Sequence, residues 1–84
     1  MKIHVYTDPG HGWASVPLSL LVDLGIDNKV STYSYQRGKR AYLEEDCDLS
    51  LLIGALRERG VTPEWVEHHT DRRSPIRSYD HYRA

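Results

Sequence analysis

The feature that most constrains the fold is an apolar stripe in the second half of the chain. Its four side chains follow the i, i+3, i+4, i+7 spacing of one helical face: Leu49, Leu52, Ile53 and Leu56. Gly60 predicts the end of this helix, and Pro63 prevents it from resuming. Because a helix with one apolar face must bury it against another layer, we expect it to cover a sheet.

Residue patterns elsewhere predict that sheet and a second, shorter helix. Alternating, β-branched or aromatic residues predict five strands, over 2–7, 13–16, 30–36, 40–44 and 64–69. Pro17 suits the first turn of a short helix that Gly25 ends, with Ile26 packing beyond the glycine. The predicted fold class is α+β, a small, mostly antiparallel sheet with two helices in the order β-β-α-β-β-α-β.

Length and composition set the remaining bounds. The 84 residues suffice for one domain with a thin core. We expect residues 1–70 to form this domain and residues 71–84 to form a basic, tyrosine-containing tail docked on it. Cys47 is the only cysteine, which excludes an internal disulfide and favours a reducing cytoplasm. Neither a signal peptide nor an uncharged run of roughly 20 residues is present, so we expect no membrane insertion.

The glycine-rich turn after the first predicted strand is one candidate binding loop. Asp8, His11 and Trp13 offer a carboxylate, an imidazole and a stacking surface among glycines whose N–H groups can face a ligand. The spacing matches neither a phosphate-binding loop nor a dinucleotide fingerprint. The competing interpretation is a hairpin turn with Trp13 in the core.

An aromatic strand beside a basic turn is the second candidate, with Tyr33, Tyr35 and Arg37 as its binding residues. Such a composition suits base stacking and phosphate neutralisation. The carboxylates immediately downstream would repel a polyanion, so direct nucleic-acid binding is not expected. Ordinary packing of tyrosines on a sheet is the alternative.

Carboxylates cluster before the second predicted helix, where Glu44, Glu45 and Asp46 form an acidic surface suited to a partner rich in Arg and Lys. The alternative is helix capping, by Asp46 or Asp48, with the other carboxylates near the positive helix end. In that position the pKa of Cys47 would be lowered. The segment lacks the ligand spacing of a calcium-binding loop.

Histidines do not form a metal site in our interpretation, and we predict neither a metal nor a cofactor. His68 and His69 are adjacent on a predicted strand and therefore point to opposite faces. No catalytic residue is predicted either, because no sequence element supplies an oxyanion hole or an orienting third group.

The C-terminal segment carries the last candidates. Arg72, Arg73 and Arg77 can recognise phosphates or carboxylates through paired N–H donors, and Tyr79 can stack or pack in a groove. A solvated tail is the alternative. Docking on the chain's own domain is favoured by the apolar surface of Ile76 and the tyrosines.

Several of these motifs together resemble a family of small proteins encoded by bacteriophages, prophages and other bacterial mobile elements, for which no mechanism is established. The resemblance spans most of the chain, through four motifs: TDPGHGW at 7–13, YSY at 33–35, YLEEDCD at 42–48 and IRSY at 76–79. By analogy with accessory proteins of this origin, it implies a function against host defence.

The resulting expectation is a non-enzymatic inhibitor of bacterial antiviral defence, similar to an anti-CRISPR protein, that binds a host defence protein in the bacterial cytoplasm. The alternatives are a sponge that sequesters a nucleotide-like anion used as an immune signal, a small nucleotide-acting enzyme, and, for assembly, a homodimer. An inhibitor needs a broad patch, whereas a sponge needs a pocket with convergent Arg and aromatic groups. A deep pocket formed by His11, Trp13, Tyr35 and the tail would favour the sponge or the enzyme.

Overall fold

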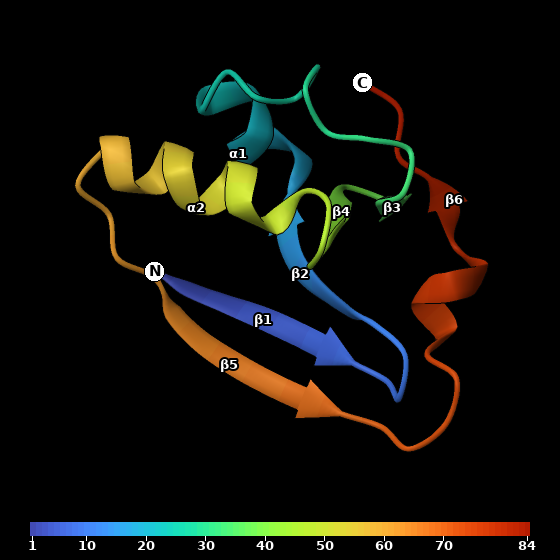
Figure 1. The fold of residues 1–84 in the computed structure, drawn as a ribbon. Helices are drawn as coiled ribbons and strands as arrows, with labels where there is room; N and C mark the ends of the chain where they lie inside the picture. Colours follow the sequence, from blue (N-terminus) through green and yellow to red (C-terminus); the bar gives the residue numbers. More distant parts are fainter.

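A single six-stranded sheet organises the chain, and two helices cover one of its faces (Figure 1). The computed structural model describes residues 1–84. Its elements are β1 (Lys2–Thr7), β2 (Gly12–Pro17), α1 (Leu18–Asp23), β3 (Tyr35–Arg37), β4 (Arg40–Glu44), α2 (Leu49–Glu58), β5 (Glu64–His69), a 3₁₀ turn η1 (Pro75–Ser78) and β6 (Asp80–His81). The strand order is β5-β1-β2-β4-β3-β6, and only β1 and β5 run parallel. The predicted α+β class with a mostly antiparallel sheet and two helices is confirmed.

Strand alternation gives the sheet two different faces. The apolar residues of one face are buried beneath the helices: Ile3, Ala14, Val16, Ala41 and Leu43. Leu21 of α1 and Leu52 and Leu56 of α2 complete this core, and each is at most 1% exposed. The opposite face carries polar and aromatic residues, because successive side chains of a strand point to opposite sides. We call it the open face.

Both helices end as the glycines predict. Gly25 adopts a φ of +71°, and the Ile26 N–H donates to the Leu21 carbonyl while the Gly25 N–H donates to Val22. Gly60, at a φ of +70°, ends α2 in the same way. This pattern satisfies carbonyls that the helix leaves without partners. Ile26 is 5% exposed and belongs to the core, as expected.

The strand predicted over 30–36 is wrong over residues 30–34, because only Tyr35–Arg37 is strand. Asp48 explains the difference: its carboxylate accepts hydrogen bonds from the Ser31 N–H, the Ser31 hydroxyl and the Ser34 hydroxyl. These bonds hold the preceding loop against the start of α2 and compete with strand pairing. The predicted side-chain cap is also wrong, since Asp48 occupies the N-cap position of α2 without bonding a helical N–H.

Residues 71–84 cross from the end of β5 to the β3 edge of the sheet, in the orange and red part of the chain in Figure 1. The Ser74 side chain caps η1 by accepting from the Ile76 N–H. Ile76 is 4% exposed and Tyr82 is 2% exposed, and the Tyr82 hydroxyl donates to the Asp27 carbonyl. Strand β6, which the sequence did not predict, pairs with β3. None of the helices has the length and apolar character needed to span a bilayer.

Candidate functional site

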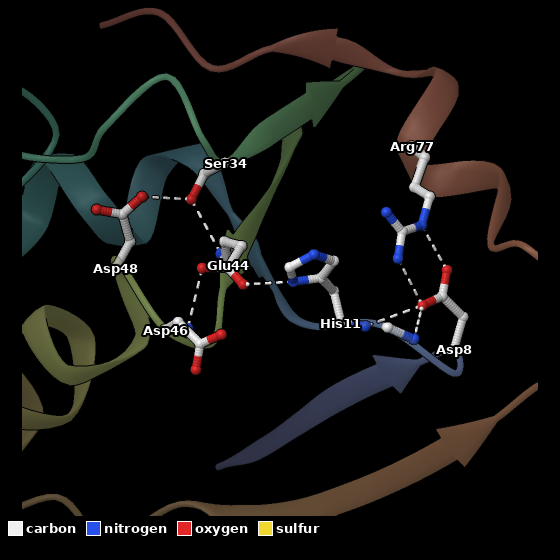
Figure 2. Close-up of polar contacts among 8 residues, drawn as sticks. Asp8, His11, Ser34, Glu44, Asp46, Asp48 and Arg77 are labelled. Carbon is white, nitrogen blue, oxygen red and sulfur yellow. Dashed lines mark hydrogen bonds and ion pairs between the residues drawn. The ribbon is translucent and has the colours of Figure 1, made fainter.

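A buried ion pair joins the glycine-rich turn to the C-terminal segment. The Asp8 carboxylate, whose side chain is 1% exposed, accepts from Arg77 Nε at 2.6 Å and from Arg77 Nη2 at 2.8 Å (Figure 2). It also accepts from three backbone N–H groups, those of Gly10, His11 and Ser74. Asp8 therefore fixes both the turn and the chain that crosses it.

Electrostatics keep this pair charged. The bonds from Arg77, followed by those from the backbone N–H groups, hold the pKa of Asp8 far below its usual value, although burial acts in the opposite direction. The same contact raises the pKa of Arg77. The guanidinium carbon lies 5.3 Å from the centroid of the Trp13 ring, so Arg77 also covers the indole. Its charge is thus matched by Asp8 before any ligand binds.

Glu44, the last residue of β4, contacts both the glycine-rich turn and the residues that follow β4. Its side chain is 8% exposed; Oε1 lies 3.2 Å from His11 Nδ1, and Oε2 accepts from the Asp46 N–H at 2.9 Å (Figure 2). Its own N–H donates to the Ser34 hydroxyl. Pairing of β2 with β4 places Trp13 opposite Glu44, which explains why residues 33 positions apart meet.

These contacts surround a pocket of about 290 Å³, which we call the acidic pocket. Eight residues line it: His11, Trp13, Tyr33, Tyr35, Glu44, Asp46, Cys47 and Arg77. Trp13 is 2% exposed and meets Tyr35 edge to face, with 6.3 Å between ring centroids, whereas Tyr33 is 70% exposed. Trp13 therefore fits both interpretations of the glycine-rich turn. It is buried, as a core residue would be, and it lines a candidate binding pocket.

Cation binding is the chemistry that this arrangement favours. One ligand atom from each of His11, Glu44 and Asp46 lies within 4.8 Å of the other two. A carboxylate oxygen that accepts one hydrogen bond retains a further lone pair, so Glu44 can still accept bonds from a cationic group. The same three residues could share a metal ion, and the expectation of no metal stays a prediction.

Five of the thirteen predicted binding residues lie outside the acidic pocket and its Asp8 anchor: Arg37, Glu45, Arg72, Arg73 and Tyr79. Glu45 is exposed and sits close above Gly12, where an added Cβ would come within 2.7 Å of its carboxylate. Arg37 lies over the Tyr79 ring, 5.0 Å from its centroid. Arg73 lines a shallow hollow beside Asp8, and Arg72 is exposed.

The predicted lowering of the Cys47 pKa is wrong. Its thiol lies beside carboxylates, and a hydrogen bond with Glu44, burial and the negative charges of Glu44, Asp48 and Asp46 raise the pKa instead. Ser34 was not predicted as a site residue, although its hydroxyl positions Glu44. No local pattern distinguishes it from any other serine beside a strand. The opposite orientation of His68 and His69 is confirmed, since His68 contacts His4 whereas His69 contacts Thr7.

Comparison of the chain with protein-family models, with curated proteins and with solved structures finds no match. The resemblance to proteins of mobile elements therefore stays a prediction from sequence motifs. Function has to be argued from the geometry and charge of the site.

Proposed function

We propose that the protein is a non-enzymatic binding protein that captures a Lys or Arg side chain of a protein partner in the acidic pocket. The observation that carries this proposal is the convergence of Glu44, Asp46 and His11 beside aromatic rings. A cationic side chain would accept no hydrogen bond but donate several, which matches carboxylate oxygens that retain free lone pairs. Glu45 at the exposed rim adds negative charge that would steer a basic surface toward the pocket.

Charge argues against a nucleotide-like anion in this pocket. His11, Trp13, Tyr35 and Arg77 do line one pocket, the composition expected of a nucleotide sponge. However, Arg77 is already paired with Asp8, and Glu44 and Asp46 would repel phosphate oxygens. The arrangement therefore supports a protein-binding function at this pocket better than sequestration of an anion.

Aromatic rings and pocket size support a single side chain as the ligand. Tyr33 and Tyr35 offer ring faces or edges beside the carboxylates, and a cation over an aromatic face gains about 0.5–1 kcal/mol at an exposed site. A volume of about 290 Å³ is at the small end for an independent small-molecule site. An Arg or Lys side chain that projects from a folded partner is small enough for this volume and carries the positive charge that the aromatic rings attract.

The resemblance to mobile-element proteins suggests the setting of this activity. In that setting the partner is a host defence protein in the bacterial cytoplasm, and occupation of its basic surface inhibits it. An enzymatic alternative based on Cys47 draws no support from the site, because a raised thiol pKa leaves little thiolate at neutral pH.

A titration with Nα-acetyl-arginine amide and Nα-acetyl-lysine amide, followed by NMR, tests the pocket chemistry. We expect saturable shifts of the Trp13 indole signal that weaken with added salt. Asp46→Lys should abolish them, and Glu58→Lys is the matched control, because Glu58 is an equally charged, exposed residue at the end of α2.

The same pair of variants tests the biological proposal in a phage-protection assay with host cells. Asp46→Lys should remove the protective effect of the protein and Glu58→Lys should keep it, with both variants retaining the melting temperature of the wild type. Equal activity of the two variants, or shifts that persist in Asp46→Lys, would contradict a function of the acidic pocket.

A further inference from the structure

A second cavity, of about 350 Å³, lies between the open face and the C-terminal segment. Five aromatic rings line this cavity. The four that pair with one another define what we call the tyrosine cavity, namely Tyr6, Tyr42, His68 and Tyr79, and the fifth is His69. The hydroxyl-bearing Thr70 and Ser74 also line it, and no carboxylate does. Its lining therefore carries no negative charge, unlike that of the acidic pocket.

The rings form two pairs on different strands. Tyr6 of β1 stacks on His68 of β5, with 4.8 Å between centroids and 15° between planes. Tyr42 of β4 meets Tyr79 edge to face at 5.1 Å. One strand, β2, separates β1 from β4, so the backbones of the strands that carry Tyr6 and Tyr42 lie about 10 Å apart. This spacing leaves room for one planar ring against either pair.

One cation without an acidic partner, Arg37, stands at the rim of the tyrosine cavity. Arg37 lies over Tyr79 and makes no ion pair with any carboxylate of the chain. The strand register pairs Arg37 with Arg40, whose guanidinium bonds the Ser15 hydroxyl and carbonyl and also lacks a carboxylate partner. Asp71, which follows the lining residue Thr70, contacts His69 and is 98% exposed.

We propose that the tyrosine cavity binds a nucleotide unit, with the base against the tyrosine rings and the phosphate at Arg37. Aromatic side chains on an open sheet face beside basic residues stack bases without reading sequence. The unit is either a free nucleotide or one member of a single strand, and the second case would overturn our expectation of no direct nucleic-acid binding. This proposal does not depend on the acidic pocket.

Calorimetric titration of the full chain with AMP, adenosine and an octamer of riboadenylate tests the proposal. We expect saturable binding of AMP, weakened about 5- to 150-fold by Tyr42→Leu or Tyr79→Leu, the effect of removing one base-stacking ring. Tyr33→Leu, which removes an equally large ring outside this cavity, should leave the affinity unchanged.

Arg37→Gln should weaken AMP about tenfold and leave adenosine unchanged, since only AMP has a phosphate for the guanidinium. Arg57→Gln, on the exposed part of α2, is the matched control. Tighter, salt-dependent binding of the octamer would identify a single strand as the source, and equal affinities would identify a free nucleotide.

Two results would overturn the proposal: no saturable binding of AMP or octamer at millimolar concentration, or binding that survives both Tyr42→Leu and Tyr79→Leu. Melting temperatures of the variants separate lost binding from lost folding. Asp46→Lys should bind AMP like the wild type, so failure of the acidic pocket and failure of the tyrosine cavity give different results.

Discussion

Ser34→Ala is the substitution whose effect the structure specifies best. Ser34 is fully buried, and its hydroxyl joins two parts of the site by donating to Asp48 and accepting from the Glu44 N–H at 2.9 Å. Alanine removes both bonds without adding bulk. Asp48 keeps two bonds from Ser31, whereas the Glu44 N–H is left without a partner.

The magnitude follows from these two losses. A hydrogen bond to a charged carboxylate contributes about 1.5–3 kcal/mol, and an orphaned buried donor costs about 1–3 kcal/mol. Because Asp48 retains its Ser31 bonds, we take the lower ends and expect a loss of about 2.5 kcal/mol in the free energy of unfolding. For a domain of this size, such a loss lowers the melting temperature by about 10–20 °C.

Urea unfolding followed by tryptophan fluorescence measures this loss, with Ser31→Ala as the matched control. That variant removes the bond from the Ser31 hydroxyl to Asp48 and the exposed bond that this hydroxyl accepts from the Tyr33 N–H, but keeps the bond from the Ser31 N–H to Asp48, and Ser31 is only partly buried. It should therefore lose less stability than Ser34→Ala. A change below about 1 kcal/mol in Ser34→Ala, or a larger loss in Ser31→Ala, would refute the reasoning.

Other predictions concern acid stability, glycine positions and thiol reactivity. Because Arg77 and backbone donors depress the pKa of Asp8, its contribution to folding is fully present above about pH 4 and is lost progressively as the pH falls below that value. Asp8→Asn should therefore flatten the acid side of the melting temperature plotted against pH. Gly54→Ala, within α2 and facing open space, should stabilise by about 0.5–1 kcal/mol, whereas Gly60→Ala at positive φ should destabilise by about 1–2 kcal/mol in thermal melts. Cys47 should react with iodoacetamide at pH 7.5 more slowly than an unstructured peptide thiol, and a faster reaction would contradict its raised pKa.

Local patterns predicted the elements whose residues carry their own signals. Helix α2, the glycines at 25 and 60 and the strands β1, β4 and β5 depend on neighbouring residues, and they lie where expected, although Ile53 of the apolar stripe lies outside the core cluster. Strand β6 and the loop before β3 depend on distant partners, namely β3 itself and Asp48. No periodicity in the sequence encodes such contacts.

Assembly of the candidate site depended even more on distant pairing. Asp8 and Arg77 are 69 positions apart, and His11 meets Glu44 only because β2 pairs with β4. The sequence identified these residues as binding candidates from their types alone. It could not show that Asp8 neutralises Arg77, which leaves the carboxylates of Glu44 and Asp46 as the charge that the pocket offers.

Removal of residues 71–84 should lower the stability of the fold. This expectation decides which variants can test the C-terminal segment. The deletion exposes the cavities left by Ile76 and Tyr82, and burial of a large apolar side chain contributes about 1.5–3 kcal/mol. The two together amount to about 3–6 kcal/mol of a total of about 5–15 kcal/mol. We therefore expect the melting temperature, followed by circular dichroism, to fall by more than about 10 °C. Lost binding in a protein ending at Thr70 would then reflect lost folding, so a single substitution within the segment, Tyr79→Leu, is the informative variant. An unchanged melting temperature would show that the contacts of Ile76 and Tyr82 contribute little to the fold.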